Sequence, residues 1–173
     1  MNLDPHTTHP AALPTDVLRE GCVCETLTRS GPGGQHRNRV QTGIRIRHID
    51  TDLRAEAFEH RSQKRNMENA VFRLRLKMAL EIRRTIGPDT APDPRWRQHS
   101  RARQIQLSET HDDYPALLAD ALDHLEASGF AAAETAERLG ISTSQLIRLI
   151  KKTPAAFERL NRRRMESGLP PLK

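Results

Sequence analysis

The hydrophobic period of this chain changes near residue 62 from that of a strand to that of a helix, and this change constrains the fold more than any other feature. Before it, the run "TGIRIRHID" alternates Ile44 and Ile46 with two arginines, which is typical of a half-buried strand. After it, apolar residues recur at helical spacing from Met67 to Ile86, which predicts an amphipathic helix. We therefore expect an α+β fold in which one long helix packs on a small sheet.

Two further alternating runs, "CVCETLTR" and "LRAEAFE", complete the expected sheet, which is mixed or antiparallel. Turn residues 50–52 join the last two strands into a hairpin. The run "LPTDVLRE" predicts a short helical turn capped by Thr15 or Asp16.

The long helix is expected to begin after the N-cap Ser62 and to stop at Gly87 and Pro88. Its exposed face is expected to be basic, and its later arginines contact either RNA or solvent. The cations of this face are Lys64, Arg65, Arg73, Arg75, Lys77, Arg83 and Arg84.

The patterns divide the chain into four segments. They are a disordered N-terminus at residues 1–12, the α+β domain at 13–87, a basic linker at 88–111 and an all-α, helix-turn-helix-like module at 112–173. In the linker, Trp96 either stacks on a base or fills the gap between the domains, and we favour the second role.

The composition indicates a partner of negative charge. The formal net charge is +6, from 28 Lys and Arg against 22 Asp and Glu, and nucleic acid is favoured over a membrane. Cys22 and Cys24 are too close for an unstrained disulfide and too few for a thiolate metal site, so we expect reduced thiols. A signal peptide and a long apolar run are both lacking, which predicts a cytoplasmic protein without membrane contact.

The segment "RSGPGGQHRN" concentrates glycine before one glutamine and a basic cluster. Glycine permits a backbone to approach a partner closely. The segment lacks the Gly-Lys-Ser/Thr of a phosphate-binding P-loop, and no helix follows at once to bind a phosphate.

This segment resembles the GGQ loop in the catalytic domain of bacterial class I peptide chain release factors and of their codon-independent ribosome-rescue relatives. The matching loop residues are Ser30, Gly31, Gly33, Gly34, Gln35, His36 and Asn38, whereas Arg39 replaces the usual Lys. The run "HRSQKRNMENA" is similar to the start of the family's long helix through Arg61, Ser62, Gln63, Asn66 and Ala70. The resemblance covers about residues 13–87.

The resemblance implies hydrolysis of the ester of peptidyl-tRNA in the ribosomal peptidyl transferase centre. Water is the expected nucleophile, since the loop has no evident nucleophile–base pair. The backbone N–H of Gln35 would donate to the developing oxyanion while its side chain admits only water, and Gly33 and Gly34 keep the backbone accessible. By the same analogy, Gln35 is a target for N5-methylation by a glutamine methyltransferase.

The residues expected to contact ribosomal RNA flank the loop or lie on helices. They are Arg29, His36, Arg37, Asn38, Arg39, Arg61, Lys64, Arg65, Arg148, Lys151 and Lys152. For His36 a general base is the alternative role, and for Arg37 and Arg39 it is solvent exposure.

The C-terminal run "AAAETAERLGISTSQLIRLIKK" predicts a helix-turn-helix that binds structured RNA, with its turn at Gly140 and with Ser142 or Thr143 as the cap of the second helix. The alternative is a plain helical hairpin whose core is Leu139, Ile141, Leu146, Ile147 and Ile150. Further basic residues follow at Arg159, Arg162, Arg163 and Arg164.

We expect a codon-independent peptidyl-tRNA hydrolase that rescues ribosomes as a monomer, with ribosomal RNA of the 23S type and P-site peptidyl-tRNA as partners. About twenty-nine residues precede the loop in this sequence, so we do not expect a stop-codon-reading region. No cofactor or metal is expected. The alternative is a non-catalytic RNA-binding quality-control factor, and the GGQ loop argues against a DNA-binding regulator.

Overall fold

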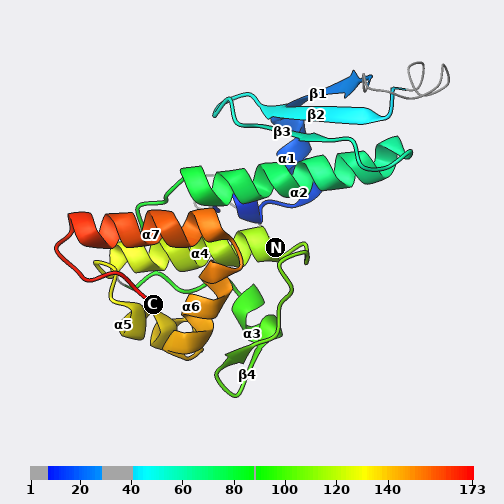
Figure 1. Cartoon of the computed structure of the whole chain (residues 1–173). Coiled ribbons are helices and arrows are strands. Elements are labelled where there is room, and N and C mark those ends of the chain that lie inside the picture. The colour runs from blue at the N-terminus through cyan, green and yellow to red at the C-terminus, as the bar shows by residue number, and fades with distance from the viewer. Residues whose placement is uncertain (1–7, 29–40, 88) are drawn as a thin grey trace. The chain divides into compact units, whose positions relative to one another are not determined.

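The computed structural model of the chain describes residues 8–28, 41–87 and 89–173 (Figure 1). The chain forms two compact units, Met1–Met78 and Ala79–Lys173. The first contains a small antiparallel sheet and most of one long helix, and the second is mainly helical. The predicted α+β class, with a helical module after the sheet, is confirmed.

The sheet of the first unit has three antiparallel strands in the order β1-β2-β3. The strands are β1 (Cys22–Leu27), β2 (Gly43–His48) and β3 (Arg54–Ala57). A turn joins β2 to β3, as the residues at 50–52 predicted. The alternating runs therefore predicted all three strands.

One face of this sheet and one stripe of helix α2 (Gln63–Glu81) supply the core of the first unit. The sheet contributes alternate residues of β2 and β3, because successive side chains of a strand point to opposite faces. The buried residues are Ile44, Ile46, Ala55 and Ala57 of the sheet and Ala70, Val71, Leu74 and Met78 of the helix.

Residues 8–12 are folded, although disorder was expected over residues 1–12. A 3₁₀ helix, η1 (Pro10–Ala12), follows His9, which is buried and accepts the backbone N–H of Ala11. The buried Arg75 side chain donates to the Ala11 carbonyl over 2.8 Å. This hydrogen bond joins residues that are 64 positions apart and holds the segment in place. No local sequence pattern could predict it.

The short helix α1 (Thr15–Glu20) is confirmed, but its predicted cap is wrong. The N-cap position is Pro14, and neither Thr15 nor Asp16 caps the helix, because both already lie inside its first turn. Leu18 anchors α1 in the core, where its exposed fraction is 1%.

Helix α2 ends at Glu81, before the predicted stop at Gly87. The Arg83 guanidinium donates to the Ala79 carbonyl near the end of the helix. The backbone N–H of Arg84 donates to the Asp123 carboxylate over 3.2 Å, which draws the chain out of the helix. The predicted helix was therefore too long, because Ile82 and Ile86 continue the helical spacing although they lie beyond the end of α2.

The second unit contains five helices and a hairpin within its described residues. They are α3 (Arg95–His99), β4 (Ser100–Arg101), β5 (Gln104–Ile105), α4 (Tyr114–Ala127), α5 (Ala132–Arg138), α6 (Thr143–Lys151) and α7 (Pro154–Glu166). Residues 88–111, expected to be a linker, thus include α3 and the β4–β5 hairpin.

Helix α4 is the centre of the second unit, since every residue from Tyr114 to Leu125 is buried. The turn between α5 and α6 contains Gly140 at φ +72°, a conformation that glycine adopts without strain. Of the two predicted caps, Ser142 is the N-cap of α6 and accepts the N–H of Gln145 over 3.3 Å, whereas Thr143 is the first residue of the helix. Of the predicted hairpin core, Leu139, Ile141, Leu146 and Ile150 are buried, whereas Ile147 is only half-buried.

A search of the described helices for membrane-spanning candidates finds none that combines the required length with the required hydropathy.

Candidate functional site

The residues at the centre of the predicted loop lie outside the described residues. These are Gly33, Gly34 and Gln35, together with Arg29, His36, Arg37, Asn38 and Arg39. The structure describes the protein on either side of them, up to Thr28 and from Gln41 onward. The described part of the predicted site is therefore the frame of the loop, which consists of the strand ends and the helix that flank it.

The sheet brings the two ends of the loop together. Strands β1 and β2 are antiparallel, and Leu27 at the end of β1 pairs with Gly43 at the start of β2. The Thr26 hydroxyl donates to the side-chain oxygen of Gln41 over 3.3 Å, which adds a contact beside the last pair. The described residues on either side of the loop therefore lie together at one end of the sheet.

The first turns of α2 hold the chain where it returns from the loop. The Gln63 amide donates to the Gln41 carbonyl over 2.5 Å, and the Asn66 amide donates to the Thr42 carbonyl over 2.6 Å. We call Gln63 and Asn66 the anchor pair. Both belong to the helix motif that resembled the release factors, and the structure places them at the base of the loop.

Asn66 also fixes the turn that leads into α2. Its amide N–H₂ donates to the His60 carbonyl over 2.8 Å, and its oxygen accepts the His60 N–H over 2.9 Å. The side chain is fully buried. A buried polar group that loses its partner costs about 1–3 kcal/mol, so a residue without both an N–H₂ and an oxygen at this position leaves backbone groups unsatisfied.

Gly43 allows close packing at the same place. A Cβ atom on this residue would lie 2.4 Å from a ring carbon of Phe58 and 2.9 Å from the Leu27 carbonyl oxygen. The oxygen belongs to the backbone of the paired strand and cannot move aside easily. Glycine is therefore required for the observed packing at the base of the loop.

Three cations surround the start of α2 in the neighbourhood of the anchor pair. Arg61, Lys64 and Arg65 are exposed, and none has an ion pair with another described residue. Positive charge near a helix N-terminus is unfavourable by about 0.3–1 kcal/mol per residue. A placement that opposes the helix dipole is typical of a surface that meets a polyanion.

Other cations of this unit already have partners. Arg45 lies 2.6 Å from Glu56 and 3.5 Å from Glu25 on the open face of the sheet, and Arg54 pairs with Asp52. On the predicted basic face, Arg73 and Lys77 are exposed as expected, whereas Arg75 is buried and Arg83 and Arg84 are half-buried beyond the end of α2. Arg73 pairs with Glu59, Arg75 is buried against Ala11, Lys77 donates to the Arg54 carbonyl, and Arg83 and Arg84 pair with Asp123.

The predicted basic residues of the helical module fall into two groups. Arg148 and Lys151 are exposed on α6, and the Lys151 ammonium lies 5.0 Å above the centre of the Phe157 ring. Lys152 instead donates to the Leu107 carbonyl and lies 3.8 Å from a Glu109 oxygen.

The arginines of α7 all have partners among the described residues. Arg159 pairs with Glu81, Arg162 with Glu158 and Arg163 with Glu126, while the buried Arg164 donates to the carbonyls of Pro170 and Phe130.

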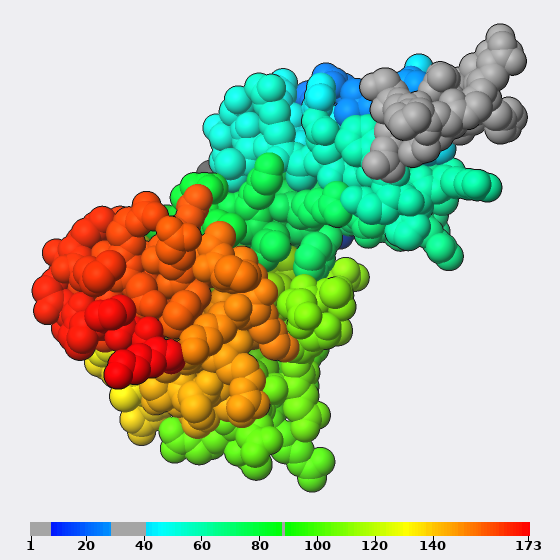
Figure 2. All heavy atoms as spheres, in the orientation of Figure 1, coloured from blue at the N-terminus to red at the C-terminus, as the bar shows by residue number. Residues whose placement is uncertain are grey.

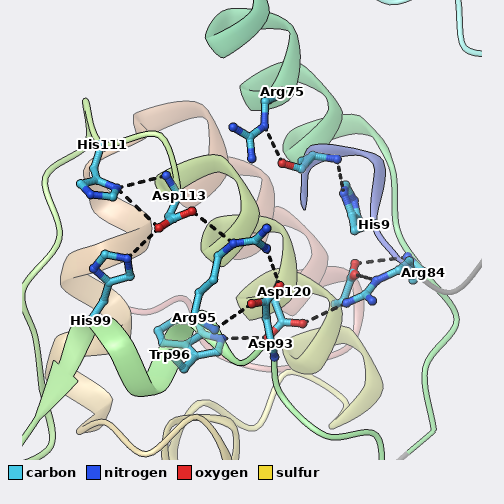
Figure 3. A network of polar contacts seen from close by, with 12 residues as sticks. His9, Arg75, Arg84, Asp93, Arg95, Trp96, His99, His111, Asp113 and Asp120 are labelled. Atoms are coloured by element: carbon cyan, nitrogen blue, oxygen red, sulfur yellow. Dashed lines mark hydrogen bonds and ion pairs between the residues drawn. The ribbon is translucent and has the colours of Figure 1, made fainter. Parts of the chain in front are cut away.

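The sequence analysis missed a buried acidic network in the second unit (Figure 3). Asp120 accepts the Trp96 indole N–H over 2.8 Å and the Arg84 guanidinium over 2.9 Å, and the fully buried Asp123 pairs with Arg83 and Arg84. Burial raises the pKa of Asp120 above its ordinary value. The signal was two aspartates, three positions apart, on a helix that is mainly apolar before them.

The same network settles the role of Trp96. Its exposed fraction is 2%, so the ring cannot stack on a base in this structure. The ring belongs to the core beside α4, where the polar edge of the indole is satisfied by Asp120.

One group of described residues has the composition of a metal site. Donor atoms of His99, His111 and Asp113 lie within 4.8 Å of one another. His99 Nε2 is 2.8 Å from one Asp113 oxygen, and Arg95 Nε is 3.1 Å from the other. The positive charge of Arg95 on the Asp113 carboxylate would repel a metal ion bound to the same carboxylate. The hydrogen bonds that join α3 to the residue before α4 account for the position of these three side chains.

Comparison with known proteins defines the class. The RF-1 domain matches residues 14–113, more than half of the chain, and the chain therefore belongs to the RF-1 domain family. The matched region includes the sheet, the loop, α2 and the β4–β5 hairpin, and it ends directly before α4.

The curated relatives are release factors. The chain is 39% identical over 79 residues to peptide chain release factor 2 of Stenotrophomonas maltophilia. The aligned region covers 45% of this chain and 19% of that protein. It is 35% identical over 63 residues to peptide chain release factor 1 of Chlorobaculum tepidum, covering 36% of this chain and 18% of the relative. For peptide chain release factor 1 of Ureaplasma parvum the identity is 44% over 54 residues, covering 31% of this chain and 15% of the relative. The chain thus spans less than a fifth of the length of these relatives.

Proposed function

We propose that this chain acts in translation as a ribosome-dependent peptidyl-tRNA hydrolase of the codon-independent, ribosome-rescue type. Membership of the RF-1 domain family and the names of the relatives support a role in termination. The observation that carries the proposal is the anchor pair, because Gln63 and Asn66 hold the two backbone carbonyls at the end of the GGQ loop. A catalytic loop needs such a fixed base to place one amide accurately.

In the proposed reaction, water attacks the ester carbonyl carbon that joins the peptide to the terminal ribose of tRNA. The new carbon–oxygen bond forms a tetrahedral oxyanion, and the bond to the ribose oxygen then breaks. The peptide leaves as a carboxylic acid, and the ribose oxygen takes up a proton to become a hydroxyl. The backbone N–H of Gln35 donates to the oxyanion and the leaving oxygen, which stabilises the transition state more than the substrate.

The neighbouring residues have supporting roles in this proposal. Gly33 and Gly34 admit the Gln35 backbone into a narrow RNA cavity, and the Gln35 side chain, a target for N5-methylation, selects water as the nucleophile. Ribosomal RNA is contacted by Arg29, His36, Arg37, Asn38, Arg39, Arg61, Lys64 and Arg65. Of these, Arg61, Lys64 and Arg65 are exposed beside the anchor pair without an ion pair to another described residue.

The proposed division of labour follows the segments of the chain. Residues 13–87 carry out hydrolysis, and residues 112–173 bind RNA through Arg148, Lys151 and Lys152. The partners are the ribosome and P-site peptidyl-tRNA in the cytoplasm, met by the protein as a monomer.

Single-turnover peptide release tests the proposal. Ribosomes with labelled peptidyl-tRNA in the P site and truncated mRNA are mixed with wild type, Gly34→Ala or Gln35→Ala. We expect Gly34→Ala to slow release by about 100-fold or more, the effect of losing one oxyanion donor. Arg54→Gln is the control, since this exposed residue lies at the far end of the same sheet from Gly43.

A non-catalytic RNA-binding factor is the second candidate. The exposed Arg148 and Lys151 on α6 favour it, because neither has an ion pair with another described residue. Ribosome binding by wild type without any peptide release would establish this candidate and refute the hydrolase. Rapid release that depends on Gly34 would refute it.

A further inference from the structure

The β4–β5 hairpin of the second unit has an unusual turn. Ala102 and Arg103 connect its strands, with φ angles of +50° and +62°. Two-residue hairpin turns of this kind normally use Asn-Gly or Asp-Gly. A residue with a side chain costs about 1–2 kcal/mol in the left-handed region. The strained turn nevertheless presents arginines at Arg101 and Arg103, and such strain is typical of functional positions.

The hairpin is bound to both ends of α6. At its start, the backbone N–H of Ser142 donates to the Arg103 carbonyl over 2.9 Å, and the Arg103 guanidinium lies 3.5 Å from the Ile141 carbonyl. At its end, Lys152 donates to the Leu107 carbonyl just beyond β5. In Figure 2 the atoms of the hairpin segment and of α6 adjoin on the face turned to the viewer. Helix and hairpin therefore present one continuous surface.

The charges of this surface differ from those of the adjoining helices. Arg101 and Arg103 of the hairpin and Arg148 and Lys151 of α6 are exposed, and none of the four has a carboxylate partner among the described residues. On the neighbouring helices four arginines are paired with glutamates: Arg138 with Glu134, Arg159 with Glu81, Arg162 with Glu158 and Arg163 with Glu126. Uncompensated positive charge thus collects where helix and hairpin meet.

We propose that α6 and the β4–β5 hairpin together form a binding surface for double-helical RNA, in which Arg101 and Arg103 contact phosphates beside those contacted by Arg148 and Lys151. The choice of RNA rests on the proposed function at the ribosome. The shape of the surface also favours RNA over DNA, because a single helix about 10–12 Å wide already fills the B-DNA major groove of about 12 Å and leaves no space for the hairpin. A helix joined to a hairpin suits the wide, shallow minor groove of RNA and its flanking phosphates better.

The test measures the affinity of the full chain for a fluorescein-labelled RNA hairpin about two helical turns long. Fluorescence anisotropy is recorded at several salt concentrations for wild type, Arg101→Gln, Arg148→Gln and the double variant. Arg162→Gln is the matched control, since it removes the same charge from an exposed helix position where Glu158 already pairs with it. Circular dichroism verifies that each variant is folded.

Each of Arg101→Gln and Arg148→Gln is expected to weaken binding on the order of tenfold. Each should also lower the slope of log affinity against log salt by about one, while the control matches wild type. Equal affinities for Arg101→Gln and the control would overturn the proposal. Tighter binding of a DNA duplex of the same sequence, weakened by the same variants, would also overturn it in favour of DNA.

Peptide release separates this proposal from the proposed function. Gly34→Ala should bind the RNA hairpin as wild type does, because the loop lies in the other unit. Loss of RNA affinity in the two variants, together with a wild type that releases no peptide, would leave the RNA surface intact and refute the hydrolase. Normal release with no effect of the variants on RNA affinity would refute the RNA surface alone.

Discussion

Replacing Asn66 by Asp is expected to damage the frame of the GGQ loop without changing its volume. The carboxylate keeps an oxygen for the His60 N–H but loses the N–H₂ that donates to the Thr42 and His60 carbonyls at 2.6 and 2.8 Å. Each unsatisfied buried carbonyl costs about 1–3 kcal/mol. We therefore expect a loss of about 2–4 kcal/mol, taking the lower half of the sum because these contacts are only partly buried.

Two measurements separate stability from function for this variant. The first unit spans residues 1–78. In a domain of that size, a loss of about 2 kcal/mol in the free energy of unfolding lowers Tm by about 8–16 °C, which thermal unfolding detects directly. Single-turnover release, measured where both proteins are folded, should slow by at least about tenfold, because a displaced loop misplaces its amide. Release at the wild-type rate by the folded variant would refute the argument that Asn66 positions the loop.

The chain offers a matched control for this substitution. Asn161 in the second unit likewise donates to the Leu172 carbonyl, over 3.2 Å, and accepts the Leu172 N–H, over 2.7 Å. Asn161→Asp removes the donated hydrogen bond and keeps the accepted one, so it makes the same chemical change far along the chain from the loop. Its release rate should equal that of wild type, and a slowing similar to that of Asn66→Asp would indicate a general effect of the mutation.

Three other predictions concern buried or titratable groups. Asp123→Ala should lower the free energy of unfolding in urea by about 3 kcal/mol, because it leaves the half-buried Arg83 without its carboxylate partner and the half-buried Arg84 with Asp120 alone; a loss below about 1 kcal/mol would contradict this. Burial lowers the pKa of His124 below 6.5, so the unfolded chain gains its proton first as the pH falls. The free energy of unfolding should therefore decrease as the pH falls from about 7.5 to 5.5, by up to about 1.4 kcal/mol per pH unit. The decrease should be smaller in His124→Leu, and equal pH profiles of the two proteins would contradict the role of His124. Burial, then the neighbouring Cys24, raises the pKa of Cys22 to about 11, leaving about one thiolate in a thousand at pH 8. Iodoacetamide should accordingly modify the exposed Cys24 well before Cys22, and mass spectrometry of the digested protein would reveal the opposite order.

Sequence patterns predicted the elements well where one local cause dominates. The alternation around Ile44 and Ile46 predicted β2 because one face of the strand is buried. The cap at Ser142 and the turn at Gly140 were predicted because both depend on the residue itself. The end of α2 was not predicted, because the Asp123 carboxylate that binds the backbone of Arg84 lies 39 positions away.

The candidate site shows the same division. The motif identified Gln63 and Asn66 as similar to family residues, but only the structure reveals that they bind the carbonyls of Gln41 and Thr42. Hydrogen bonds across such separations in sequence have no periodic signature. The hairpin turn at Ala102 and Arg103 was missed for a related reason, since its residues contradict the usual turn preferences.

By itself, the sequence determined the class of the fold, the order of its elements and the loop that places this chain among the RF-1 domain proteins. Periodicity, caps and turn residues act between near neighbours, so they can be read along the chain. Only the tertiary structure decided which of the many cations are available to a partner. Arg75, Arg84 and Arg163 carry the same charge as Arg61, Arg101 and Arg148, but the first three meet a buried carbonyl or a carboxylate supplied by distant segments. A charge becomes free or compensated through what the folded chain places beside it, and that is a property of packing.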